Sequence, residues 1–304
     1  MGDKKHLIEN VEKDVKPYEQ FMAKKETFKQ GWGNILYKDK QENMYTSEVI
    51  IHDWITQPIL ENVDTKNKNI KLVDFGGAAG ATLLIVAKQL KLGKVECYNV
   101  DINRVALERG QKSFPEIHFV ESPLSMIQID DNSFDAGYSR FVMQYNPLVS
   151  KENSLPTQAD ILKEFYRVMK HGSVLVIIWP GARDNREYPA FNEFSATIQA
   201  YVSGRSVEEV LKQRSMTDTK TMGEIAQSIG FKILTTTELR TTDLSTEKYY
   251  DRFGEKMKQN GATLEGLQKL IQDSIKKYSS TLEFETIEGE QLVVASLSRL
   301  VLSK

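Results

Sequence analysis

The chain has 304 residues, and its 40 lysines and arginines nearly balance its 42 aspartates and glutamates, which leaves a net charge of −2. This balance argues against nucleic acid as the main partner, because phosphate binding draws on a marked excess of basic charge. The single cysteine, Cys97, excludes an intrachain disulfide and a cysteine-based zinc site, and we expect no metal. Because no apolar run could span a bilayer and no signal-peptide core is seen, we expect a cytoplasmic protein.

The first 62 residues differ in character from the rest of the chain. Residues 1–62 are rich in lysine, glutamate and aromatic side chains, and apolar residues recur at helical spacing in stretches such as Val49–Trp54. The polar, turn-prone stretch Asn62–Asn69 then precedes a change of pattern. We therefore expect a helical N-terminal cap over residues 1–62 and a main domain over residues 63–304.

From Ile70 onward, short apolar runs alternate with amphipathic helical stretches. This alternation is typical of strand-helix-strand units around a parallel sheet, so the sequence predicts a doubly wound α/β fold. The predicted strands are 71–75, 94–100, 117–120, 134–139 and 173–179, and the predicted helices between them are 81–90, 104–113 and 158–169.

After Pro180 helices dominate the pattern. Two regions, at about 186–216 and 246–277, are interpreted as helical insertions, and the second of them resembles a helical lid, with amphipathic core packing as the alternative. The predicted helices are 189–203, 206–214, 219–229, 246–259 and 263–277, and the predicted strands are 232–237 and 298–303.

A turn of small residues comes after the first predicted strand, which ends in Asp74. Glycine and alanine in such a turn let the backbone pass close to a ligand, and the amides of the turn and of the next helix point toward it. The nearest register of the dinucleotide-binding pattern lacks two of its three glycines. The register acid-x-Gly-x-Gly-x-Gly fits better, since Asp74, Gly76 and Gly80 satisfy it and only Ala78 departs from it.

This stretch resembles the first motif of the class I S-adenosylmethionine-dependent methyltransferase family, and in particular its small-molecule type. The resemblance implies a Rossmann-like, mostly parallel seven-stranded sheet and S-adenosyl-L-methionine as the cofactor. It assigns cofactor contacts to Asp74, Gly76, Gly77 and Gly80, with the turn under the methionine part of the cofactor. It also places Ile102 against the adenine face.

A second acid stands at the end of the next predicted strand. Asp101 lies 21 residues after Gly80, a position at which a carboxylate can accept hydrogen bonds from two ribose hydroxyls. Such bonds to a charged acceptor contribute roughly 1.5–3 kcal/mol each. We therefore expect Asp101 to bind the ribose; a solvated turn residue is the alternative.

The third strand region departs from the family pattern. Pro123 occupies the position at which the family usually carries an acid for the adenine amino group. Adenine recognition is then expected from backbone groups near Ser122 and Leu124, or from the hydroxyl groups of Ser122 or Ser125.

The loop that begins at Ser139 is where this fold presents groups to the transferred methyl. Ser139 is expected to line the cofactor site, and Gln144 and Tyr145 stand where related small-molecule enzymes often carry histidines. Tyr145 is interpreted as a positioning or proton-handling group, or alternatively as a wall of the pocket. In the cap, His52 is a candidate base, although a histidine on an aromatic helix face is more often structural.

Trp32 lies in a Gly-Trp-Gly element that resembles one found in sterol and related lipid methyltransferases. The resemblance implies that Trp32 closes over the cofactor and walls an apolar pocket, whereas simple anchoring of the cap is the competing interpretation.

Together these features predict transfer of a methyl group from S-adenosyl-L-methionine to an oxygen, nitrogen or carbon of a small molecule, by in-line displacement in a closed pocket. The acceptor would be apolar or aromatic, and the chain could form a homo-oligomer. Three alternatives stay open: a cofactor-binding regulatory or scaffold protein without turnover, an NAD-dependent reductase, and methylation of protein or RNA.

Overall fold

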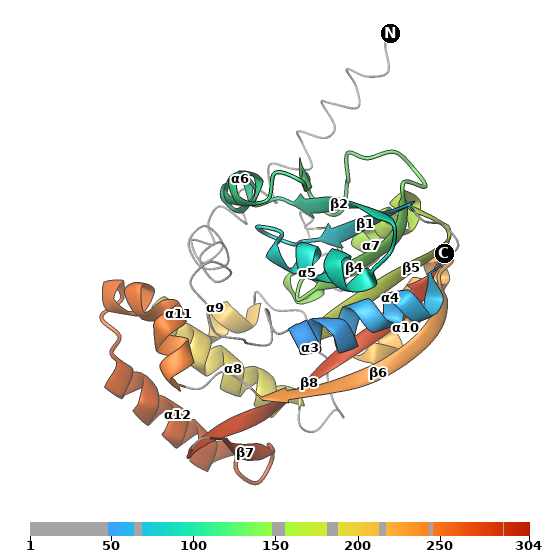
Figure 1. Cartoon of the computed structure of the whole chain (residues 1–304). Helices are drawn as coiled ribbons and strands as arrows, with labels where there is room; N and C mark the ends of the chain where they lie inside the picture. Colours follow the sequence, from blue (N-terminus) through green and yellow to red (C-terminus); the bar gives the residue numbers. More distant parts are fainter. Residues whose placement is uncertain are drawn as a thin grey trace.

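The computed structural model describes residues 48–63, 69–147, 156–180, 188–212, 217–242, 246–287 and 289–304. Within these ranges a sheet runs in the order β3-β2-β1-β4-β5-β8-β6, and β7 pairs with β8 outside this path (Figure 1). The strands are β1 (Asn69–Phe75), β2 (Lys94–Asp101), β3 (His118–Glu121), β4 (Phe134–Arg140), β5 (Met169–Pro180), β6 (Lys232–Thr242), β7 (Phe284–Ile287) and β8 (Glu290–Ser303). Strands β1 to β5 are parallel, whereas β8 runs antiparallel to both β5 and β6, so the predicted doubly wound, mostly parallel sheet is confirmed.

Helices cover both faces of this sheet, and β5 shows why. Its residues point alternately to the two faces, and both sets are apolar, as expected for a parallel strand that is buried on both sides. Val174, Val176 and Ile178 belong to one hydrophobic cluster, and Leu175 and Ile177 belong to the other. The helices nearest the sheet are α5 (Ala81–Leu90), α6 (Arg104–Ser113), α7 (Gln158–Val168) and α10 (Thr219–Ile229).

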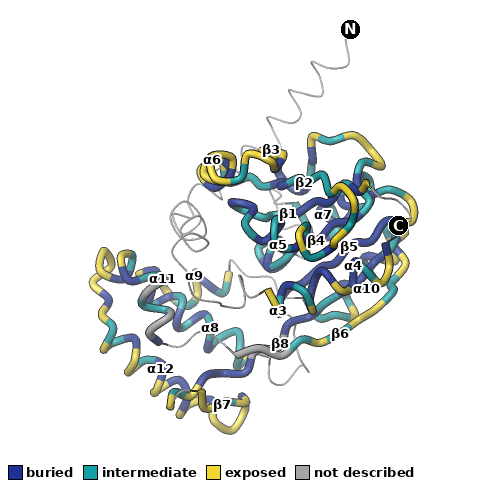
Figure 2. Tube along the Cα trace, in the orientation of Figure 1, coloured by how far each residue is buried: buried dark blue, intermediate teal, exposed yellow. Residues whose placement is uncertain are grey.

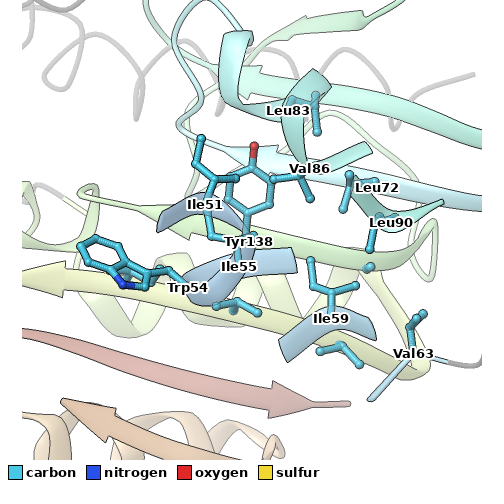
Figure 3. Packing of buried hydrophobic residues seen from close by; sticks show 14 of the residues in the cluster. Ile51, Trp54, Ile55, Ile59, Val63, Leu72, Leu83, Val86, Leu90 and Tyr138 are labelled. Atoms are coloured by element: carbon cyan, nitrogen blue, oxygen red, sulfur yellow. The ribbon is translucent and has the colours of Figure 1, made fainter. Parts of the chain in front are cut away.

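The described end of the predicted cap packs into the main core. Here α3 (Glu48–Ile51), the π-helix η2 (His52–Thr56) and α4 (Gln57–Asn62) succeed one another without a break. Figure 3 shows Ile51 and Ile55 packed against the ring of Tyr138 and against side chains of α5. Residues 1–47, which make up the rest of that cap, lie outside the described residues.

A second body of helices lies beyond the carboxyl ends of the central strands. It contains α8 (Tyr188–Ser203), α9 (Val207–Lys212), α11 (Thr246–Gln259) and α12 (Leu264–Tyr278) (Figure 1). The helices α8, α11 and α12 share a hydrophobic cluster that also takes in Phe284 of β7 and Val293 of β8. In β8, residues 292–294 and 300–302 are buried, whereas its first two residues, 290 and 291, are not (Figure 2). We call this body the helical lobe; it joins the two segments that the sequence predicts as insertions.

Candidate active site

The order of the strands marks where a ligand would bind. From β1 the chain moves to β2 on one side, and after β3 it crosses over to β4 on the other side of β1. In an open α/β sheet, ligands bind outside the carboxyl ends of the strands at such a switch point. The residues that the structure brings there are the loops 76–80, 101–103 and 139–145, which contain most of the predicted site residues.

The glycines after β1 face inward. A Cβ atom added at Gly77 would lie 2.1 Å from Asn99 Oδ1 and 2.4 Å from Asp74 Oδ2, and one at Gly76 would lie 2.4 Å from Val142 Cγ2. These glycines therefore let the loop lie flat on the ends of the strands beneath it. The glycines are thus needed for packing as well as for the close approach of a ligand that the sequence predicts. The backbone of residues 76–78 is half-exposed and faces outward.

Side chains at the end of β2 hold this loop in place. The amide of Ala78 donates to Asp101 Oδ2 at 2.8 Å, and the carbonyl of Ala78 accepts from Asn99 Nδ2 at 2.7 Å. The second oxygen of Asp101 accepts from the amide of Asn103 at 2.8 Å. Ala78 needs such support because its φ is +48°, a left-handed conformation that costs a residue with a Cβ roughly 1–2 kcal/mol.

A buried carboxyl group lies directly beneath the loop. Asp74 is 4% exposed, and its Oδ2 accepts a hydrogen bond of 2.7 Å from the hydroxyl group of Tyr138. Burial raises the pKa of Asp74 from about 3.8 to about 7, although Tyr138 and Arg140 favour the ionised form. Asn99 Oδ1 faces the same point under Gly77 and has no hydrogen-bond donor among the residues that the structure describes.

The residues predicted to contact adenine follow β2 and β3. Ile102 is half-buried next to Asp101, whereas Leu124 is 6% exposed and belongs to the core. The hydroxyl group of Ser122 donates to the carbonyl of Met126 at 2.8 Å, and this side chain is buried. The Ser122 hydroxyl therefore points into the protein, which leaves backbone groups and the hydroxyl of the half-buried Ser125 for the predicted adenine contact.

The loop after β4 is tightly folded. Ser139 is buried and donates to the carbonyl of Phe75 at 2.9 Å, so it ties β4 to β1. Gln144 is also buried, and its Nε2 donates to the carbonyl of Phe141 at 2.9 Å. Tyr145 is half-buried, so of the two predicted acceptor-side residues it is the one that reaches the surface of the loop.

The comparison with known families fits this geometry. Residues 73–177 match the family model described as a methyltransferase domain, and this range contains all three loops. These residues form a methyltransferase domain, and the fold is that of class I methyltransferases. No curated protein sequence matches the chain.

Solved structures share the fold of this chain at low identity. One is a protein from Bacillus halodurans described as a methyltransferase, with a TM-score of 0.55, 16% identity, and coverage of 78% of this chain and 93% of that one. Loganic acid methyltransferase with SAH has a TM-score of 0.56 and 12% identity, with 85% and 92% covered. The cyclase SpnF has a TM-score of 0.51 and 14% identity, with 88% and 84% covered. A fold that also carries a cyclase does not by itself fix the reaction, so the family match carries more weight.

Two predicted site residues lie apart from the three loops or outside the described residues. The ring of His52 lies on the π-helix, is 41% exposed, and hydrogen-bonds Asp53 at 3.2 Å. Trp32 falls within residues 1–47 and is not described. In the described part of the chain, no helix is long and apolar enough to cross a membrane.

The sequence reasoning missed Asn99 and Tyr138. Asn99 interrupts the apolar run of β2, and a buried polar side chain in a parallel strand needs a hydrogen-bond partner, so it could have been noticed. Tyr138 offers no such signal, because a tyrosine in a strand usually packs its ring and leaves its hydroxyl group at the surface.

The Asp74→Asn variant of this protein is expected to change how stability depends on pH. Since the folded-state pKa of Asp74 is raised to about 7, protonation stabilises the wild-type fold below about pH 4, and this stabilisation is lost as the pH rises through 7. Each unit of pKa shift corresponds to about 1.4 kcal/mol. The asparagine cannot ionise, and its amide group can donate to Asn99 Oδ1.

Urea unfolding of both proteins at pH 5 and pH 8 measures this difference. The free energy of unfolding of the variant minus that of wild type should be larger at pH 8 than at pH 5. An identical pH dependence in the two proteins would show that Asp74 ionises normally in the folded state.

Proposed function

We propose that this protein transfers a methyl group from S-adenosyl-L-methionine to a small-molecule acceptor. The observation that carries this proposal is the outward-facing backbone of residues 76–78, fixed at the switch point with the half-exposed carboxylate of Asp101 at its edge. No other described part of the chain combines a rigid small-residue loop with an acid at the ends of two neighbouring strands.

The residues present fit the adenosyl part of this cofactor. Asp101 Oδ2 accepts from the amide of Ala78 and Oδ1 accepts from the amide of Asn103, and the amide of Ile102 also favours the ionised carboxylate. Because each carboxylate oxygen has two lone pairs, Asp101 keeps acceptor capacity for ribose hydroxyls, as proposed from the sequence. Ile102, half-buried beside it, offers an apolar surface for the adenine face.

The reaction requires mainly that the acceptor is aligned with the methyl group. The bound cofactor supplies an electrophilic methyl group on a sulfonium, and the loop after β4 positions the acceptor in line with it. Holding two reactants in line contributes on the order of 7–11 kcal/mol. Tyr145 would line the acceptor side, where its hydroxyl group can orient the acceptor or handle a proton, and Gln144 would support the same loop from inside.

The helical lobe supports a small apolar or aromatic acceptor. It lies beyond the ends of the strands that carry the cofactor loop, and Tyr249, Tyr250 and Phe253 are partly buried against its cluster. Aromatic side chains predominate in pockets for small organic ligands. One similar structure is named loganic acid methyltransferase, and loganic acid is also a small molecule.

Two measurements test the proposal. Titration calorimetry with S-adenosyl-L-methionine and S-adenosylhomocysteine should give saturable binding of both. A screen with the cofactor labelled at its methyl group should then transfer label to a small molecule rather than to added RNA or protein. Absence of binding would refute the proposal, and binding without transfer to any acceptor would favour a regulatory protein of the same fold.

A further inference from the structure

A fully buried glutamine lies beneath the loop after β4. Gln158 is the first residue of α7 and is 0% exposed. Its Nε2 donates to the carbonyl of Met143 at 3.0 Å and to the carbonyl of Asn146 at 3.1 Å. These carbonyls belong to the first residue of the short 3-10 helix η3 (Met143–Tyr145) and to the residue directly after it. Both amide hydrogens of Gln158 thus bracket the turn that carries Gln144 and Tyr145.

The oxygen of the same side chain is held from the other side. Gln158 Oε1 accepts from the hydroxyl group of Thr217 at 2.6 Å, and the carbonyl of Thr217 accepts from Trp179 Nε1 at 2.7 Å. Thr217 is 2% exposed and Trp179 is 0% exposed. Thr217 directly precedes Asp218, the N-cap of α10, so the chain of bonds links the loop to the start of α10.

The loop depends on this support because its own conformation is costly. Phe141, where the loop begins, has a φ of +59°, which is a strained conformation for an aromatic residue. Without Gln158 the buried carbonyl of Asn146 would lose its side-chain donor, whereas that of Met143 would keep the backbone amide of Asn146 at 3.1 Å. A buried carbonyl that loses its donor is unfavourable, so the bonds from Gln158 favour the observed arrangement of the loop.

We propose that Gln158 is a positioning residue that holds Tyr145 and the rest of the post-β4 loop in the arrangement needed for methyl transfer. It is buried under the loop and acts through it, without touching the substrate. The part of this inference that concerns turnover rests on the proposed function, whereas the part that concerns the loop does not.

The test compares Gln158→Met with a matched variant elsewhere. Gln89 makes a similar pair at the end of α5, since its Oε1 accepts from Thr56 at 2.7 Å and its Nε2 donates to the carbonyl of Glu48 at 2.7 Å. Gln89→Met therefore removes the same kind of bonds away from the loop. Thr217→Val removes only the bond from the Thr217 hydroxyl to Gln158. It replaces Gln158→Met in the test if that variant does not fold.

Amide hydrogen exchange of residues 141–146 is the first readout, because it needs no acceptor. We expect exchange of these amides to rise at least about tenfold in Gln158→Met and by less in Thr217→Val, and to stay at the wild-type rate in Gln89→Met. The dissociation constant for S-adenosylhomocysteine should stay within about twofold of wild type in all three, since the bonds of the cofactor loop are unchanged.

The second readout is turnover on the acceptor found in the labelling screen. Gln158→Met should lower kcat at least about tenfold, and Gln89→Met should leave kcat unchanged. Loop exchange and kcat that are the same in Gln158→Met as in Gln89→Met would overturn the inference. If wild type fails to bind the cofactor, the proposed function fails, and hydrogen exchange alone decides whether Gln158 positions the loop.

Discussion

Gly77→Ala is expected to destabilise the fold by about 3 kcal/mol or more, the upper end for overpacking, and to abolish cofactor binding. The new methyl group would lie 2.1 Å from Asn99 Oδ1 and 2.4 Å from Asp74 Oδ2. Neither side chain can yield, because each is buried and hydrogen-bonded, Asp74 to Tyr138 and Asn99 to Ala78. Urea unfolding and titration calorimetry with S-adenosylhomocysteine measure the two effects.

Ala78→Gly, one residue further along, is the matched control. It removes a methyl group from a residue at φ +48°, which relieves strain of roughly 1–2 kcal/mol. The greater freedom of glycine in the unfolded chain offsets about 0.4–1 kcal/mol of this gain. The control should thus be as stable as wild type or slightly more so, and should bind the cofactor normally. Gly77→Ala with the stability of wild type would contradict the inward-facing arrangement of the loop.

Asp101→Ala is expected to weaken cofactor binding at least about 100-fold, because it removes the proposed acceptor of two ribose bonds worth roughly 1.5–3 kcal/mol each. It also releases the amide of Ala78, so the cofactor loop loses one of its supports. Calorimetry with S-adenosyl-L-methionine measures the dissociation constant, and hydrogen exchange at Ala78 monitors the loop.

Asp135→Ala separates loss of affinity from general loss of stability. Asp135 also accepts a backbone amide, that of Lys71 at 2.9 Å, and an ion pair from Lys170 at 2.7 Å. It lies near the amino ends of β1 and β4, opposite the candidate site. This control should lose stability and retain affinity. An unchanged dissociation constant in Asp101→Ala would mean that Asp101 only supports the loop.

The central strands and the helices between them were predictable because each carries a strong local pattern. The residues of β5 are apolar on both faces, and α7 begins with Thr157 in a capping box with Asp160. The candidate cofactor loop was predictable for the same reason, since its small residues come directly after an apolar strand that ends in Asp74.

The parts that were missed depend on distant neighbours. The strand β7 was not predicted, and β8 begins at Glu290 rather than near Ser298. Its first half is recognisable only once the helical lobe is there to bury Val293. In the sequence Gln158 looks like an ordinary polar residue at the start of a helix. It becomes a buried residue that hydrogen-bonds both the loop and Thr217 only when these fold around it.

The long strand β8 also has a consequence for the order of assembly during synthesis. Its first half completes the core of the helical lobe through Val293, and its second half lies between β5 and β6 through Leu300 and Leu302. Neither body can close before residues 290–303 have left the ribosome. Until then the nascent chain exposes the apolar edge of β5, and such an unpaired edge invites aggregation, so we expect assistance from a chaperone to raise the yield of folded protein.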